Sequence, residues 1–109
     1  MDDNVLILTN HAVHRIRQRM GVSKRAAERI AMKAWTEGIT HSETTNYKHL
    51  NRWVTKQYFW NRQANQIRLW GDKAFLFSGT TLMTVIQIPH NLLGYVQDIM
   101  ESKGQTEEE

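Results

Sequence analysis

The spacing of apolar residues changes period along this chain, and that change limits the fold more than any other feature. Between residues 10 and 37 apolar side chains recur every three to four positions, the period of a helix with one buried face. Between residues 67 and 88 they alternate or run continuously, as in strands joined by tight turns. The sequence therefore predicts an α+β fold, with N-terminal helices packed on an antiparallel β-meander.

Two helices are predicted in the first third of the chain. One runs over about 10–20 and ends at Gly21, a residue suited to the left-handed conformation that closes a helix. The other runs over about 24–37, begins after the capping residue Ser23 and ends at Gly38. Alanines on the buried side of the second helix allow close backbone approach, so we expect the two helices to pack as a hairpin.

The rest of the chain predicts shorter elements. A brief strand is expected at 5–8 and a third helix within 47–58, although the aromatic residues of that segment also suit strands. Residues 82–88 are nearly continuously apolar, which is typical of a central strand covered on both faces. After Pro89 an amphipathic C-terminal helix is expected.

The 109 residues have room for one domain, which we place at 1–102, followed by a disordered acidic tail at 103–109. The absence of cysteine excludes a disulfide framework and favours a reducing compartment. The first residues lack the charge and apolar run of a signal peptide, and no apolar run is long enough to cross a bilayer. We expect a soluble, cytoplasmic protein with no membrane contact.

Positive charge is concentrated in the two predicted N-terminal helices. Residues 11–34 contain seven Lys and Arg against the single acid Glu28, a net charge of +6. A concentrated basic face indicates binding to nucleic acid, with RNA as the expected partner and DNA as the alternative. The equally simple interpretation is a solvated helix surface.

Three residues on the first helix suggest chemistry beyond binding. His11, Arg15 and Arg19 lie one above another at helical spacing. A histidine can transfer a proton near neutral pH, and guanidinium groups bind phosphate oxygens in a bidentate way. These are the groups that metal-independent RNA cleavage needs to activate a 2'-hydroxyl and stabilise charge on the phosphate.

The segment His11-Ala12-Val13-His14-Arg15-Ile16-Arg17-Gln18-Arg19-Met20-Gly21-Val22-Ser23 resembles a known family opening. The pattern His-Ala-x-x-Arg-x-x-x-Arg-x-Gly-Ile begins small RelE-like and BrnT-like proteins of the barnase, EndoU, colicin and RelE ribonuclease superfamily. Residues 75–77 and 82–86 resemble the closing strands of these proteins, and residues 40–62 look like an insertion. The resemblance implies RNA held by helical basic residues and an exposed sheet face. It also implies a link to toxin–antitoxin systems or to a phage or mobile element.

These observations define the candidate site residues. The proposed catalytic residues are His11, Arg15 and Arg19. Further residues are expected to bind nucleic acid because they are basic, could stack on bases or belong to the implied sheet site: His14, Arg17, Lys24, Arg25, Arg29, Trp60, Arg68, Trp70 and Thr84. The five histidines have no recognisable metal-ligand spacing, so no metal and no cofactor are expected.

Three functions remain open at this level. The first is an RNA-binding, metal-independent endoribonuclease of the RelE-like type. The second is a non-catalytic nucleic-acid-binding regulator, because no partner acid or base for the histidine is evident on the predicted sheet. The third is a protein-interaction module whose basic helices meet an acidic partner such as an antitoxin.

Overall fold

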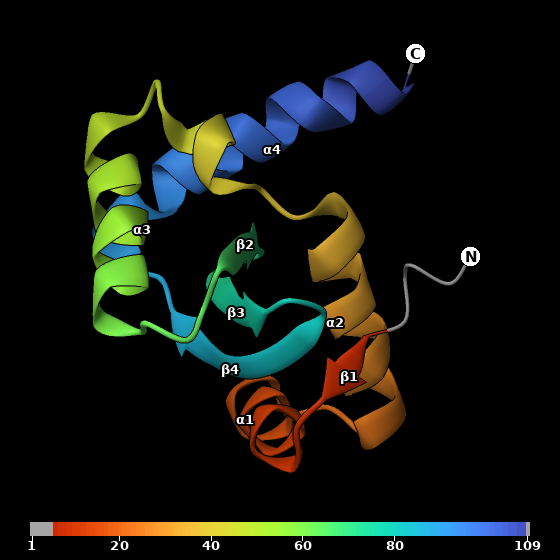
Figure 1. The fold of residues 1–109 in the computed structure, drawn as a ribbon. Helices are drawn as coiled ribbons and strands as arrows, with labels where there is room; N and C mark the ends of the chain where they lie inside the picture. The colour runs from red at the N-terminus through yellow and green to blue at the C-terminus, as the bar shows by residue number, and fades with distance from the viewer. Residues whose placement is uncertain (1–5, 109) are drawn as a thin grey trace.

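One four-stranded sheet with helices on both sides forms the fold (Figure 1). The computed structural model describes residues 6–108, with residues 105–108 described by their backbone alone. The elements in chain order are β1 (Ile7–Leu8), α1 (Asn10–Met20), α2 (Lys24–Glu37), η1 (His41–Thr44), α3 (Lys48–Trp60), β2 (Gln66–Trp70), β3 (Lys73–Ser78), β4 (Thr81–Gln87), η2 (His90–Leu92) and α4 (Leu93–Glu108). The α+β class is therefore confirmed.

The sheet has the strand order β1-β4-β3-β2. Strands β2, β3 and β4 pair antiparallel, as the predicted meander requires. The short strand β1 pairs parallel to β4 through Ile7 with Thr81 and Leu8 with Leu82, so the sheet is mixed and not purely antiparallel. Parallel pairing of such distant segments leaves no local signal in the sequence, because the paired residues are 74 positions apart.

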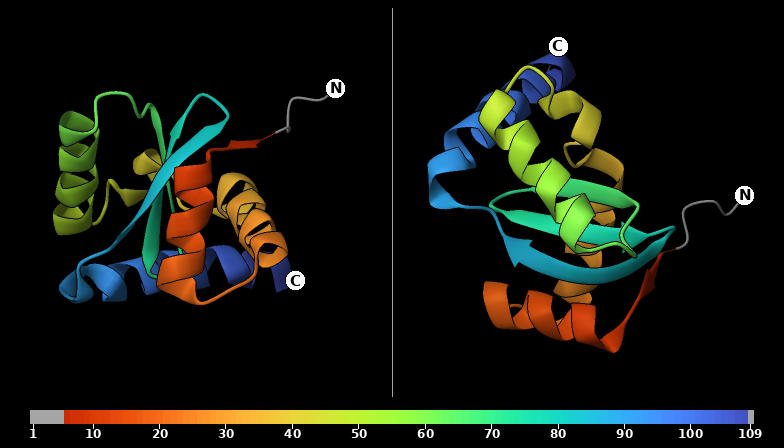
Figure 2. Two further views of the ribbon diagram at one scale, coloured as in Figure 1. Left: turned by 90° about the horizontal axis from the view of Figure 1, so that it is seen from below. Right: turned by 60° about the vertical axis from the view of Figure 1, so that its left-hand side comes forward.

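Helices cover both faces of this sheet, which Figure 2 shows edge-on in its left panel. Strand β3 explains why both layers are needed, since its side chains are buried on both sides of the sheet. Phe75 and Phe77 point into a cluster with α1 and α2, whereas Ala74 and Leu76 point into a cluster with α3 and α4. The middle of the sheet is therefore covered on both sides, and the exposed sheet face that the RelE-like resemblance implies is not confirmed.

The cluster under α1 and α2 combines small helical residues with large strand residues. Its fully buried members are Ala12, Ile16, Ala27, Ala31, Ala34, Phe75, Phe77, Leu82 and Val85. Alanines at the helix surface bring the backbone of α2 close to the sheet, and the two phenylalanines fill the space between them. This packing turns the long basic side chains of both helices away from the sheet.

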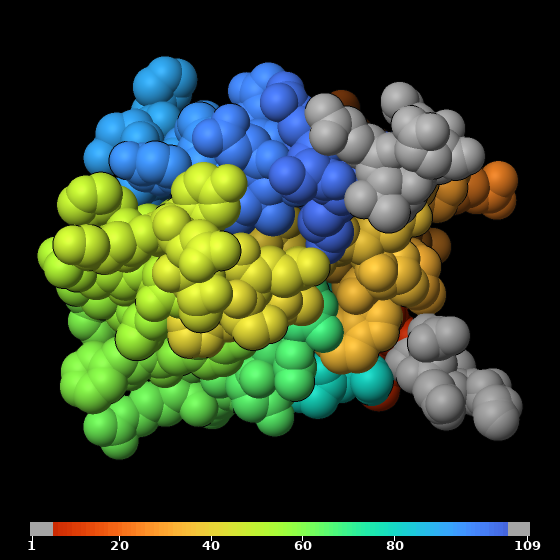
Figure 3. Space-filling view, turned by 90° about the horizontal axis from the view of Figure 1, so that it is seen from above, coloured from red at the N-terminus to blue at the C-terminus, as the bar shows by residue number. Residues whose placement is uncertain are grey.

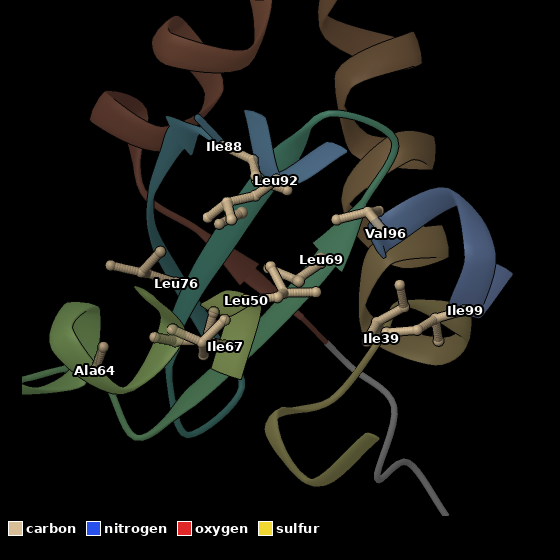
Figure 4. Close-up of a cluster of buried hydrophobic side chains, with 12 residues drawn as sticks. Ile39, Leu50, Ala64, Ile67, Leu69, Leu76, Ile88, Leu92, Val96 and Ile99 are labelled. Atoms are coloured by element: carbon tan, nitrogen blue, oxygen red, sulfur yellow. The ribbon is translucent and has the colours of Figure 1, made fainter. Parts of the chain in front are cut away.

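The second cluster joins α3, α4 and the loop before η1 to the opposite face (Figure 4). Leu50 and Val54 of α3 and Val96 and Ile99 of α4 bury against strands β2 and β3. Tyr58 fixes the position of α3, because its hydroxyl oxygen accepts a hydrogen bond of 2.9 Å from the backbone N–H of Ile67. The expected third helix is confirmed, and its buried side is settled by these contacts.

The bounds predicted for α1 and α2 agree with the structure, but their packing does not. Thr9 and Ser23 accept the capping hydrogen bonds, and Gly21 closes α1 with a φ of 65°. In Figure 1 α1 is seen nearly end-on while α2 lies along its length, so the helices cross steeply and do not form a hairpin. Each helix packs on a different strand of the sheet: α1 contacts β4, and α2 contacts β2.

Strand β4 is central as predicted, between β1 and β3, but the strand covered on both faces is β3. Residues 73–77 are all buried, including Lys73, whose ammonium group donates hydrogen bonds to Asp72 Oδ1 and Gln87 Oε1 at 2.8 and 2.9 Å. The Lys73 ammonium holds the pKa of the Asp72 carboxyl below its ordinary value. Strand β4 is less covered, since Leu82 and Val85 are buried under α1 and α2 while Met83, Thr84 and Ile86 are half-buried.

Helix α4 continues to Glu108, whereas the sequence predicts a disordered tail from residue 103. Lys103 joins the end of this helix to η1, since its ammonium group lies 3.0 Å from Glu43 Oε1. Burial opposes ionisation of Glu43, but hydrogen bonds from the Thr40 backbone and from Lys103 leave its pKa below the ordinary value. Figure 3 shows the η1 segment and α4 packed side by side. Residue 109 lies outside the described residues.

Gly38 provides a test of the close approach between α2 and β2. A Cβ at this position would overlap the carbonyl oxygen of Ala34 and lie 3.1 Å from the carbonyl oxygen of Leu69. We expect Gly38→Ala to lower the free energy of unfolding by about 1–3 kcal/mol, as overpacking does. The control is Gly94→Ala in α4, which has open space and should stabilise by about 0.5–1 kcal/mol. Urea unfolding measures both, and a neutral Gly38→Ala would contradict the packing.

Candidate nucleic-acid interface

Helix α1 presents the predicted catalytic residues on its solvent side. Thr9 accepts a hydrogen bond of 3.0 Å from the backbone N–H of Ala12, which fixes where the helix begins. Burial of Ala12 and Ile16 against the sheet then fixes its rotation. At about 100° per residue, His11, Arg15 and Arg19 follow one another along one side of the helix, where His11 and Arg19 are exposed and Arg15 is half-buried.

The structure brings His11 and Arg15 into contact. Arg15 Nε–H donates a hydrogen bond of 3.4 Å to His11 Nε2, so the two side chains lie together on the surface of α1. Arg19 lies one turn further along, is exposed, and has no hydrogen-bond or ion-pair partner among the described residues.

Five further predicted residues extend this positive region over α1 and α2. His14, Arg17, Lys24, Arg25 and Arg29 are all exposed, and none has an acidic partner within the part of the chain that the structure describes. His14 and Arg17 line a shallow hollow of about 330 Å³ with Gln18 and Val22. We call the eight residues of α1 and α2 the α1–α2 basic surface: His11, His14, Arg15, Arg17, Arg19, Lys24, Arg25 and Arg29.

Arg68 and Trp70 belong to the packing of β2 and lie outside this surface. The Arg68 guanidinium stacks over the Trp35 ring with 4.8 Å between Cζ and the ring centroid, and its Nη1 donates 2.7 Å to Gln66 Oε1. Partial burial lowers the pKa of Arg68 below its ordinary value. Trp70 packs against the cluster under α1 and α2. Both contacts give these side chains a structural role in the fold.

Trp60 and Thr84 meet on the opposite side of the sheet. They line one pocket of about 260 Å³ between the end of α3 and strand β4. Its other lining residues are Asn61, Arg62, Gln63, Ala64, Leu76 and Met83. Apart from Arg68 and Trp70, the candidate residues therefore fall into two groups, one on α1 and α2 and the other at the end of α3 and on β4, and Figure 2 shows that α3 lies on the other side of the sheet from α1 and α2.

The candidate set omits Phe59 and Arg62, although the sequence interleaves them with other aromatic and basic residues in a pattern that suits single-stranded nucleic acid. Phe59 is 69% exposed and precedes the 65% exposed Trp60, and Arg62 lines the pocket beside Trp60. A helical projection of residues 48–60 would have found Phe59, because it falls on the face opposite the buried Leu50. Arg62 lies outside the helix, and its place beside Thr84 depends on the tertiary fold.

Comparison with known proteins adds no assignment. No family model, no curated protein and no solved structure matches this chain. Among the described residues, no three His, Cys, Asp or Glu side chains gather closely enough to hold a metal ion. None of the helices in residues 6–108 combines the length and apolar character needed to cross a membrane.

Because Arg68 stacks on Trp35 and Arg19 is exposed, we expect a substitution of Arg68 to destabilise the fold and a substitution of Arg19 to leave its stability unchanged. Arg68→Gln should lower the thermal midpoint measurably, since a stacked, half-buried guanidinium contributes about 1–2 kcal/mol. Arg19→Gln should leave the midpoint unchanged, because Arg19 is exposed on α1. Differential scanning calorimetry of both variants measures the difference, and equal midpoints would show that the stacking does not stabilise the fold.

Proposed function

We propose that this chain binds nucleic acid, with RNA as the first candidate, through the α1–α2 basic surface. The observation that supports the proposal is the set of exposed Lys and Arg side chains that lack acidic partners in the described part of the chain. Among the described residues, Lys33 is the one cation of α1 and α2 that pairs with an acid, Glu37, at 3.7 Å. Uncompensated cations on a rigid helical surface attract a phosphate backbone and release its counterions.

The arrangement of the two helices favours duplex DNA as the alternative ligand. Helices α1 and α2 cross steeply and are joined by three residues, Gly21 to Ser23. Helix-turn-helix proteins use such a crossing to place their second helix in the major groove. Exposed Lys24, Arg25 and Arg29 occupy the first two turns of α2, the part of a recognition helix that contacts base edges.

Salt dependence tests this proposal. Replacing Arg15, Arg19 and Arg29 together by Gln should weaken binding and flatten the plot of log affinity against log salt by about 2 for single-stranded RNA. The matched control replaces the same three residues by Lys, which keeps the charge and should keep most of the slope. Filter binding with RNA and with duplex DNA distinguishes the two ligands.

Two outcomes would contradict the proposal. One is an unchanged slope in the Gln variant. The other is the absence of RNA and DNA binding at low salt, which would leave an acidic protein partner, such as an antitoxin, as the ligand of the same surface.

RNA cleavage without metal is the second candidate function, and the bond between His11 and Arg15 favours it. The Nε2 lone pair of His11 can accept a proton from a ribose 2'-hydroxyl once Arg15 turns to the phosphate. Arg19, one turn away, would then share the charge that builds on the phosphate oxygens. The leaving 5'-oxygen needs a proton donor, and water or the imidazolium formed in the first step can supply it.

His11→Ala tests this second candidate. If His11 transfers the proton, the variant should cleave RNA roughly 100-fold more slowly in the presence of a chelator, with RNA affinity close to wild type. Arg19→Gln should reduce both cleavage and affinity. His90→Ala, an exposed histidine of η2, is the control and should cleave at the wild-type rate. Equal rates for His11→Ala and wild type would remove His11 from the mechanism, and no cleavage by wild type would leave binding alone.

A further inference from the structure

The outer face of α3 exposes two large aromatic side chains. Phe59 and Trp60 are 69% and 65% exposed, and among the described residues Ile7 is the other large hydrophobic residue that is exposed to such a degree. Aromatic rings left in water on a well-anchored helix indicate a surface that binds something, because their burial is strongly favourable.

Cations accompany these rings on the same helix face. Lys48, Arg52 and Lys56 are spaced four residues apart, opposite the buried Leu50 and Val54, and all three are exposed. None of the three has a hydrogen-bond or ion-pair partner in the described part of the chain. Residues 44–71 contain no Asp or Glu at all, so nothing in this segment compensates the charge. The face therefore combines stacking surfaces with a row of unpaired positive charges.

The pocket between α3 and β4 continues this face. Ala64, Leu76 and Met83 give it an apolar lining, and Arg62 and Trp60 stand at its helical side. Thr84 contributes a half-buried hydroxyl that has no hydrogen-bond partner among the described residues. Its volume of about 260 Å³ is just below the range of drug-sized sites, which suits one planar heterocycle.

We propose that the α3 face and this pocket form a second nucleic-acid site, specific for single-stranded RNA and separate from the α1–α2 basic surface. Lys48, Arg52 and Lys56 hold the phosphates, while Phe59 and Trp60 stack on bases. One unstacked base enters the pocket, where Thr84 hydrogen-bonds its edge. Bases of a duplex are stacked on one another and cannot reach these rings, so the site discriminates by strandedness.

Charge selects RNA over a protein partner for this face. A protein that buried Phe59 and Trp60 would also have to cover three cations with acids in matching positions. A strand of phosphates and bases supplies both the negative charge and the flat apolar faces in one repeating unit. Helix α3 is also held firmly by Tyr58 and the buried cluster, so the platform is already formed before a strand binds.

The test uses the full chain and fluorescence anisotropy with a labelled oligouridylate of about twelve nucleotides, within the range of single-strand binding sites. Phe59→Ala/Trp60→Ala should weaken binding about tenfold or more, because each stacked base contributes substantially. Phe59→Tyr/Trp60→Phe should restore most of the affinity, since both replacements keep an aromatic face. Ile7→Ala, which truncates a comparably exposed side chain on β1, is the matched control and should bind as wild type.

A duplex RNA in the same assay separates this site from the one on α1 and α2. The Ala variant should bind the duplex as wild type does, while the Arg15, Arg19 and Arg29 to Gln variant should lose duplex binding. Unchanged oligouridylate binding by the Ala variant would overturn the second site and leave the proposed function untouched. A wild-type dimer that the same substitutions convert to a monomer, with RNA binding unchanged, would show that the aromatic face binds a second copy instead.

Discussion

Burial of β3 on both of its faces is the constraint on which the rest of this structure depends. Phe75 and Phe77 require an apolar layer on one side, and Ala74 and Leu76 require another on the other side. A single layer of helices cannot supply both. Helices α1 and α2 therefore cover one face of the sheet, and α3 and α4 cover the other. The consequence is that β3 offers no free face, and the open strand surface in the described residues is the part of β4 beside the end of α3, where Met83 and Thr84 line a pocket.

The helices meet this requirement in two different ways. Helix α2 buries alanines and thereby sits close to the strands, so that its long basic side chains extend fully into solvent. Helix α3 buries Leu50 and Val54 and packs Trp53 and Tyr58 against the same cluster, but it leaves Phe59 and Trp60 in solvent. Burial of these two large rings would be favourable, so their exposure points to a surface with another role.

Local signals in the sequence were sufficient for most elements. The bounds of α1 and α2 follow from Thr9, Ser23 and the helical period, and the three antiparallel strands follow from alternation and turn residues. Long-range relations could not be obtained this way. The parallel pairing of β1 with β4 joins segments more than 70 residues apart, and Lys103 binds Glu43 across the fold. Charge alone also could not show that Arg68 is stacked on Trp35 while Arg19 is free in the described structure.

The candidate site residues divide in the same way, into contacts that follow from helical spacing and contacts that depend on the tertiary fold. His11 and Arg15 lie four residues apart on one helix, so their contact could be predicted from helical geometry alone. Trp60 and Thr84 were each plausible separately, but their shared pocket depends on how α3 crosses β4 and was not predictable from spacing. Because β4 lies under α1 with one face and lines this pocket with the other, a single strand supports both surfaces. The cations of α1 and α3 contribute nothing to either buried cluster, so binding can change by substitution at these positions while the core that positions them stays intact.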